Sequence, residues 1–182
     1  VVKEIIKSGI LPEGALQLLS GLTTNFLDTT ESQDVVTFTG SAQTGQKLRV
    51  HPRLIQESVP FTMEADSLNA SVPGTPEFDL FVKEVRKEMT VKCGQKCTAI
   101  RRAIVPENLM EDVQIALGKQ LERTVIGDPK LKEVRMGALI NTDHRKAIKS
   151  QIEKLTTTAQ IVYGSLDSVE AIGGNDKDGA FM

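Results

Sequence analysis

Cys97 is the residue of this chain best suited to covalent chemistry. It follows a glycine–glutamine turn in the segment Gly94-Gln95-Lys96-Cys97, between a helical pattern over 76–90 and a β-rich run over 99–105. The backbone must change direction there, so the thiol can face a cavity. A cysteine thiolate attacks carbonyl carbon near neutral pH, which makes Cys97 a candidate nucleophile. The alternative for a lone cysteine is a small buried hydrophobe.

Glu64 is a second residue of chemical interest, because it follows an apolar run over 59–63 that is predicted to be a strand. A carboxylate at a strand end, beside apolar neighbours such as Phe61 and Met63, can act as a general base. The alternative is a solvated surface acid, which is what most such carboxylates are.

A glycine spacing of the form G-x4-G occurs in the segment Gly40-Ser41-Ala42-Gln43-Thr44-Gly45. It lies between a predicted strand over 35–39 and a predicted helix over 46–50. Glycine lets a backbone approach a phosphate closely, and a helix N-terminus offers free N–H groups. The spacing differs from the G-x-G-x-x-G fingerprint, and glycines at the ends of a turn are more often only turn residues.

The elements that must position these residues mix helices with strands, as in an α/β sheet. Apolar spacing predicts helices over 1–8, 25–30, 77–91, 106–124 and 142–156. Thr75 and Pro76 are expected to start the third of these, and Thr142 to cap the last. Further strands are predicted over 15–19, 69–72, 99–105 and 159–163. Arg101 and Arg102 fall in one of these strands, so their side chains are expected on opposite faces and not as one anion clamp.

Composition narrows the class of protein. The 182 residues include 40% hydrophobic and 25% charged residues, with a net charge of -2, so no basic field argues for nucleic acid. No apolar run approaches a membrane span. Cys93 and Cys97 have only His51 and His144 elsewhere, which predicts no metal site and suits a reducing cytoplasm. Both chain ends lack the usual terminal signals, which favours a fragment of a longer protein.

The order of these features resembles the aldehyde dehydrogenase superfamily. Its members show F-T-G-S-x-x-x-G, then an active-site glutamate, then G-Q-x-C. This chain has Phe38-Thr39-Gly40-Ser41 with Gly45, then Glu64, and then Gly94-Gln95-Lys96-Cys97, with the cysteine 33 residues after the glutamate. Gly127-Asp128-Pro129 and Met136-Gly137-Ala138-Leu139 are similar to later family segments. The resemblance spans essentially the whole chain.

One segment indicates which group within the superfamily the chain resembles. Met63–Ala70 departs from the family's usual E-L-G-G-K-S-P, with Asp66 and Ser67 in place of two glycines and Leu68 in place of the lysine. Together with the segment 91–102, this departure is similar to the dehydrogenase half of the bacterial ring-opening proteins of phenylacetate degradation. Those proteins are fused to a MaoC-like hydratase domain and oxidise a CoA-linked semialdehyde with NADP. Semialdehyde dehydrogenases of the benzoyl-CoA pathway are also close.

The resemblance implies an α/β, aldehyde dehydrogenase-like fold. Residues 1–69 would be the C-terminal part of a Rossmann-type dinucleotide-binding domain, and residues 70–182 most of the catalytic cysteine domain. Cys97 would be the nucleophile, its backbone N–H half of an oxyanion hole, and Glu64 the base that activates either Cys97 or the water of the hydrolysis step. The residues Gly40, Ser41, Gly45 and Ala65 would bind NADP or NAD.

The resemblance also implies partners and leaves alternatives. The expected substrate is an aldehyde, with a CoA-linked semialdehyde as the expected class, and the parent enzyme would be a cytoplasmic homo-oligomer fused to a hydratase domain. Neither nucleic acid nor a membrane is expected as a partner. One alternative is a CoA-acylating dehydrogenase, although such enzymes generally lack the glutamate. The other is a fragment with no activity of its own.

Overall fold

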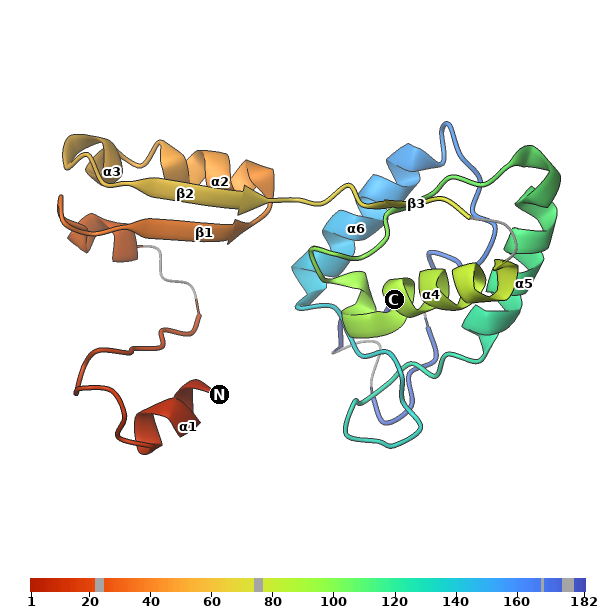
Figure 1. Cartoon of the computed structure of the whole chain (residues 1–182), viewed down its shortest axis with the longest axis horizontal. Coiled ribbons are helices and arrows are strands. Elements are labelled where there is room, and N and C mark those ends of the chain that lie inside the picture. Colours follow the sequence, from red (N-terminus) through yellow and green to blue (C-terminus); the bar gives the residue numbers. More distant parts are fainter. Residues whose placement is uncertain (22–24, 74–76, 168, 175–178) are drawn as a thin grey trace. The chain divides into compact units, whose positions relative to one another are not determined.

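The computed structural model describes residues 1–21, 25–73, 77–167, 169–174 and 179–182, and these form two compact units, Val1–Asp66 and Ser67–Met182. The first unit contains, in chain order, α1 (Val2–Lys7), η1 (Phe26–Thr29), β1 (Val36–Gly40), α2 (Ala42–Arg49), α3 (Pro52–Gln56) and β2 (Phe61–Ala65). The second contains β3 (Ala70–Ser71), α4 (Phe78–Thr90), η2 (Val91–Gly94), β4 (Arg102–Ala103), η3 (Glu107–Leu109), α5 (Met110–Glu122) and α6 (Thr142–Leu155). Figure 1 labels the helices and most of the strands. No helix in these ranges is long and apolar enough to cross a membrane.

A parallel strand pair organises the first unit. β1 and β2 run side by side, in register from Val36 opposite Phe61 to Gly40 opposite Ala65. Helices α2 and α3 connect the two strands, so the unit is a strand–helix–strand arrangement of the α/β type (Figure 1). Parallel strands need such a crossover, which is why the helix follows directly on β1.

Gly45 lets α2 pack closely on this strand pair. It is buried, and a Cβ at this position would lie 2.2 Å from Met63 Sδ and 3.1 Å from Phe38 Cδ1. Phe38 and Met63 are register partners on the two strands, so the glycine fits over both side chains. Close helix–strand packing is one of the uses of glycine in this type of unit.

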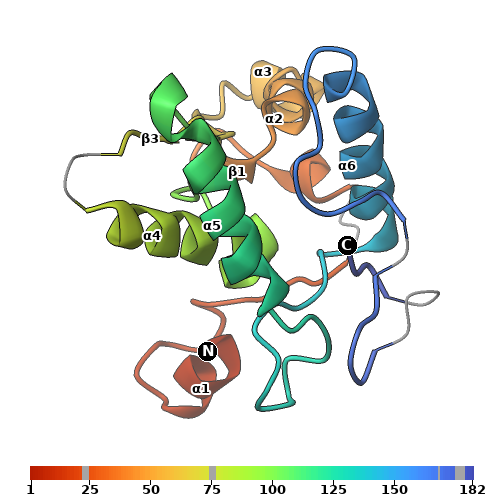
Figure 2. The same ribbon diagram turned by 90° about the vertical axis from the view of Figure 1, so that its right-hand side faces the viewer.

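Two crossing helices build the core of the second unit. Helix α4 buries Phe81, Val82 and Val85, which pack with Val113 of α5. Figure 2 shows the two helices crossing. The apolar stripe at i, i+3 and i+4 along α4 accounts for this, as its spacing predicted. Ile100 and Val105 pack against the same cluster, so the chain on either side of β4 is anchored to the core. β4 pairs in parallel with β3 over two residues.

Several predicted elements are confirmed with shifted ends. The strands at 35–39 and 59–63 are β1 and β2, and the helices at 1–8, 77–91, 106–124 and 142–156 are also found. The helix predicted at 46–50 begins at Ala42, because the Ser41 side chain accepts a hydrogen bond from the Thr44 N–H and caps it. Asn141 and not Thr142 caps α6, through its side chain and the His144 N–H. Thr75 and Pro76 lie outside the described residues.

Other strand predictions were wrong. Residues 15–19 and 159–163 are irregular chain, with Leu18 and Val162 exposed to 61% and 58%. The runs 69–72 and 99–105 shorten to the two-residue strands β3 and β4. A short apolar run becomes a strand only where a partner strand satisfies its backbone. Among the described residues, the segments 15–19 and 159–163 have no such partner.

Gly127 supplies a stability test. Its Cβ would lie 2.1 Å from the carbonyl oxygen of Ile172, which is backbone and cannot rotate away. We expect Gly127→Ala to lower the free energy of unfolding by about 1–3 kcal/mol, the usual cost of overpacking. Urea denaturation followed by circular dichroism measures this.

The matched control for this test is Gly137→Ala. The nearest atoms to a Cβ there are in the Pro129 ring at 3.9 Å, so the change should stay within about 0.5 kcal/mol. Equal unfolding midpoints for the two variants would contradict the packing argument.

Candidate active site

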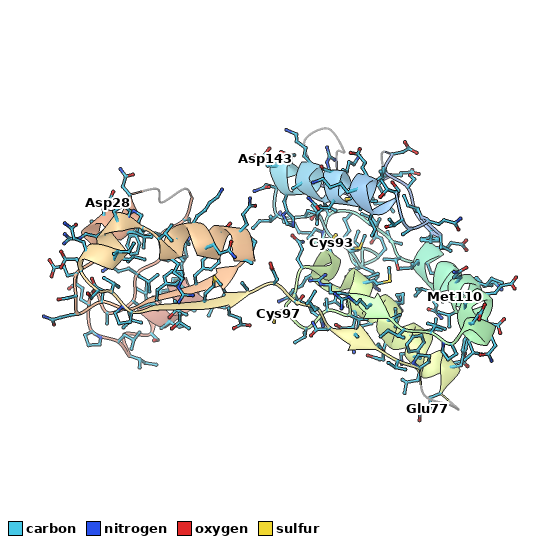
Figure 3. The ribbon with its side chains drawn as sticks, turned by 90° about the horizontal axis from the view of Figure 1, so that it is seen from above. Asp28, Glu77, Cys93, Cys97, Met110 and Asp143 are labelled. Atoms are coloured by element: carbon cyan, nitrogen blue, oxygen red, sulfur yellow. The ribbon has the colours of Figure 1, made fainter. Side chains whose placement is uncertain are left out.

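Cys97 lies in a tight turn between α4 and β4. Three consecutive residues in the left-handed region precede it, with φ of 52° at Lys92, 54° at Cys93 and 68° at Gly94. Residues other than glycine adopt such angles rarely, and strained backbone of this kind gathers at functional sites. After this reversal Cys97 is exposed, while Cys93 is half-buried at the end of α4 (Figure 3).

Asn69 holds the turn from one side. Its side-chain amide donates hydrogen bonds to the carbonyl oxygens of Cys97, at 2.6 Å, and Ala99, at 3.0 Å. The backbone carbonyl of Asn69 accepts hydrogen bonds from the backbone N–H groups of Arg101 and Arg102, at 2.9 and 3.2 Å. One residue therefore bonds the chain on both sides of the almost fully buried Ala99. The position of Cys97 is set by a side chain 28 residues away.

Arg101 holds the turn from the other side. Its guanidinium donates to the carbonyls of Gly94, at 2.9 Å, and Lys96, at 3.1 Å. Its third contact is the hydroxyl of Ser67, at 3.1 Å. Arg101 thus adds a second hydrogen bond to two carbonyls that already accept from the backbone N–H groups of Lys96 and Ala99.

Two further contacts fix the residues just before the cysteine. Lys96 Nζ lies 2.7 Å from Glu88 Oε1 of α4, and these side chains are exposed to only 24% and 16%. The Gln95 side-chain oxygen accepts from the Ile140 N–H at 3.0 Å. This second contact ties the turn to the segment 136–140.

The backbone N–H of Cys97 has no acceptor among the residues that the structure describes, although the Cys97 carbonyl is bonded to Asn69. An exposed thiol with an unengaged N–H on the same residue is an arrangement suited to attack on a carbonyl group. The thiol forms the bond, and the N–H can stabilise the negative oxygen.

The first unit brings four other predicted site residues to one edge of its strand pair. Gly40 lies opposite Ala65 at the carboxyl ends of β1 and β2, with Ser41 following Gly40. Glu64 is next to Ala65 in β2, opposite Thr39, and its side chain is exposed. Ligands of α/β sheets bind at this edge. Gly45 differs, because it packs against Phe38 and Met63.

Asp66 lies at the same edge of the strand pair and adds a negative charge there. It has a φ of 58°, where a glycine would be unstrained, and its N–H donates to the Gly40 carbonyl at 3.1 Å. Its carboxylate accepts from the Ala42 N–H at 3.1 Å, at the start of α2. Of the first-turn N–H groups of α2, that of Gln43 is without an acceptor among the described residues.

The residues present fit a nicotinamide dinucleotide at this edge. The Gln43 N–H is a donor suited to a phosphate, and Gly40 and Ala65 are small. The Ser41 hydroxyl is already bonded to the N–H and hydroxyl of Thr44, at 3.2 and 2.9 Å. Asp66 places a carboxylate beside them, so a bound phosphate would share the helix end with a negative charge.

The sequence reasoning missed the residues that hold Cys97. Asn69 was placed only at the start of a strand, and the alternation argument set Arg101 and Arg102 on opposite strand faces. The structure limits β4 to Arg102 and Ala103, so Arg101 belongs to the turn. Two successive arginines directly after a cysteine turn were the available signal, because a buried strand would not carry both charges.

The two thiols should differ in reactivity. Cys93 lines a cavity of about 800 Å³, and burial raises the pKa of its thiol above the ordinary value. The thiolate is the reacting form, so alkylation of Cys93 should be slow at pH 7.5 and should still be rising at pH 9. We expect iodoacetamide to label exposed Cys97 first, as measured by peptide mass spectrometry. Equal labelling of Cys93 at pH 7.5 would contradict this.

Comparison with known proteins relates this geometry to one family. The sequence profile described as "Aldehyde dehydrogenase family" matches residues 1–182. The chain is 38% identical over 188 residues to 3,4-dehydroadipyl-CoA semialdehyde dehydrogenase of Aromatoleum evansii, covering 100% of this chain and 36% of that protein. It is 24% identical to 2-aminomuconic 6-semialdehyde dehydrogenase of a Pseudomonas species, covering 84% of this chain and 32% of the relative. The chain thus spans about a third of the length of these relatives.

Solved structures show the same fold. An apo betaine aldehyde dehydrogenase from Staphylococcus aureus, a point mutant, superposes with a TM-score of 0.81 at 24% identity. The match covers 98% of this chain and 36% of that one. A structure of the Staphylococcus aureus enzyme in complex with NAD+ gives a TM-score of 0.70 at 24% identity, over 81% of this chain and 29% of the other. With its profile match over the full 182 residues and a relative at 38% identity, the chain belongs to the aldehyde dehydrogenase family.

Proposed function

We propose that the protein containing this chain oxidises an aldehyde to a carboxylate through a covalent intermediate on Cys97, with a CoA-linked semialdehyde as the substrate class. The observation that carries the proposal is the cysteine turn, which presents an exposed thiol and an unengaged N–H on one residue. The relative at 38% identity is named for a CoA-linked semialdehyde, which supports the substrate class.

The proposed chemistry begins with attack of the Cys97 thiolate on the aldehyde carbon. The carbonyl electron pair moves to oxygen, and the Cys97 N–H stabilises the resulting negative charge. Collapse of this thiohemiacetal releases a hydride and leaves an acyl thioester on the sulfur. NAD or NADP, when bound, supplies the hydride acceptor. Glu64 takes a proton from the water that attacks the thioester, which frees the carboxylate and regenerates the thiol.

The two units divide this work. We assign the first unit, residues 1–66, to the cofactor domain, with Gly40, Ser41 and Ala65 at its binding edge, and the second unit, residues 67–182, to the catalytic domain, so the boundary falls three residues before the one expected from the sequence. The parallel strand pair of the first unit and the cysteine turn of the second support this division. Gly45, the fourth residue of α2, is assigned an indirect part in the cofactor site, because it holds the helix against the strands.

The proposal extends to the setting of the complete protein. Its similarity to the ring-opening proteins of phenylacetate degradation favours fusion to a hydratase domain, a homo-oligomer and a cytoplasmic location. The match to a dehydrogenase named for a CoA-linked semialdehyde is consistent with such a setting.

The cysteine assignment predicts a contrast between two alanine variants of the complete protein. Cys97→Ala removes the nucleophile, so aldehyde oxidation should fall to background. Cys93→Ala changes a half-buried thiol at the end of α4 and should leave most of the activity. Reduced nicotinamide formed with an aldehyde substrate is the measurement. Comparable losses in the two variants would exclude Cys97 as the nucleophile.

The role of Glu64 predicts a specific kinetic pattern. Glu64→Gln keeps the shape but removes the base, so steady-state turnover should fall by about 10² to 10⁴. If Glu64 serves the water step, a burst of reduced cofactor should precede the stall, because the thioester still forms. Rapid-mixing absorbance at 340 nm measures both phases.

The same variant separates hydrolysis from acyl transfer to CoA. Addition of free CoA should not restore turnover if water is the natural acceptor. Full restoration would favour a CoA-acylating dehydrogenase, and unchanged turnover without CoA would exclude Glu64 as the base.

A further inference from the structure

Arg101 has a contact that bears on the direction of the Cys97 N–H. The guanidinium donates to the carbonyl of Lys96 at 3.1 Å, beside a bond from the Ala99 N–H to the same oxygen at 3.2 Å, and Lys96 and Cys97 share a peptide group. In a trans peptide group, the carbonyl and the following N–H point in opposite directions. An arginine that holds the Lys96 carbonyl on one side therefore directs the Cys97 N–H to the other side.

The guanidinium itself is held in a single orientation. Its Nη1 donates to the Gly94 carbonyl at 2.9 Å and its Nε to the Ser67 hydroxyl at 3.1 Å. With Nη2 on Lys96, all three nitrogens have separate acceptors, so rotation of the planar group would break at least one contact. A lysine offers a single charged nitrogen and cannot reproduce this geometry.

The other peptide group of Cys97 is fixed independently. Asn69 donates to the Cys97 carbonyl at 2.6 Å. Both peptide planes that flank the cysteine are thus held by side chains, whereas its own N–H has no acceptor among the described residues. Two side chains thus orient Cys97, while its backbone N–H remains available as a hydrogen-bond donor. This indicates that the N–H can bind a group that reaches the cysteine from outside the turn.

We propose that Arg101 is a positioning residue, which aims the Cys97 N–H at the oxyanion formed when the thiolate attacks a carbonyl carbon. The inference rests on the proposed role of Cys97 as nucleophile. In the step concerned, a sulfur–carbon bond forms and the carbonyl π pair moves to oxygen. Arg101 touches neither substrate nor sulfur, and it acts only through the Lys96–Cys97 peptide group.

Two reactions of Cys97 separate this role from general support of the turn. Hydrolysis of 4-nitrophenyl acetate requires attack on a carbonyl, passes through an oxyanion, and expels nitrophenolate to leave an acetyl thioester that water cleaves. Alkylation by iodoacetamide forms a sulfur–carbon bond with loss of iodide and has no oxyanion. Neither reaction needs a nicotinamide cofactor.

The expected result in the complete protein is a selective loss. Loss of one oxyanion donor costs about 10² to 10³ in rate, so Arg101→Gln should lower kcat for the ester by about 10², with little change in KM. Alkylation of Cys97, measured by peptide mass spectrometry, should stay within a factor of about three, because its transition state needs no such donor. Arg101→Lys keeps the charge and one donor nitrogen, so its kcat for the ester should lie between the values for wild type and Arg101→Gln.

The matched control is Arg102→Gln. It removes the same charge from the adjacent position, whose side chain is exposed and makes no hydrogen bond or ion pair with the described residues. Both reactions should keep their wild-type rates in this variant.

Three outcomes decide between the explanations. A selective fall in ester hydrolysis for Arg101→Gln supports the inference. Equal falls in ester hydrolysis and alkylation, in Arg101→Gln and Arg101→Lys alike, overturn it while the proposed function stands. Absence of Cys97-dependent ester hydrolysis and aldehyde oxidation in the wild-type protein overturns both.

Discussion

The side-chain hydrogen bonds to the backbone of the cysteine turn are the interactions on which the candidate site depends. Residues 91–99 contain no strand, and their short η2 turn includes left-handed residues, so turn hydrogen bonds reach only some of their carbonyls, among them those of Lys92, Gly94 and Lys96. Asn69 and Arg101 bond four of them, at positions 94, 96, 97 and 99. A hydrogen bond of this kind contributes about 0.5–1.5 kcal/mol, and a buried carbonyl left without one costs more. The direction of Cys97 follows from this pattern of acceptors.

The two positions where family glycines are replaced have each acquired a contact. Asp66 accepts from the Ala42 N–H at the start of α2, within the first unit. Ser67 binds the Nε of Arg101, within the second unit. Each contact lies within one unit. Asp66 therefore supports the start of α2 in the first unit, and Ser67 supports the cysteine turn in the second. Aspartate tolerates the left-handed angle at position 66 better than most residues do.

The sequence was a good guide to the elements with strong periodicity. The long amphipathic helix α4 and the β-branched strand β1 could be predicted because local pattern and burial agree there. The order of motifs was sufficient for the family, and the candidate site residues Gly40, Ser41 and Ala65 lie together at one edge, as the strand–turn–helix pattern implies, whereas Gly45 does not. The strand predictions failed where strand pairing decides the structure, as at 15–19 and 159–163, most of whose apolar residues are exposed.

The contacts around Cys97 could not be predicted by pattern. Asn69 reaches the turn across 28 residues, and Arg101 acts because β4 is too short to include it. Alternation rules apply to a residue only once it is known to be in a strand. The role of Gly45 was visible only in three dimensions, since Phe38 and Met63 come from two different strands.

The two anchors of the turn differ in how far along the chain they reach, and this has a consequence for folding. Arg101 bonds carbonyls five and seven residues away, whereas Asn69 bonds carbonyls 28 and 30 residues away. The entropy cost of closing a loop grows with its length, so the arginine contacts close the smaller loops. The orientation of the cysteine amide is accordingly a local property of the chain. The location of the turn against the rest of its unit is a global property, acquired only when β3 and β4 come together.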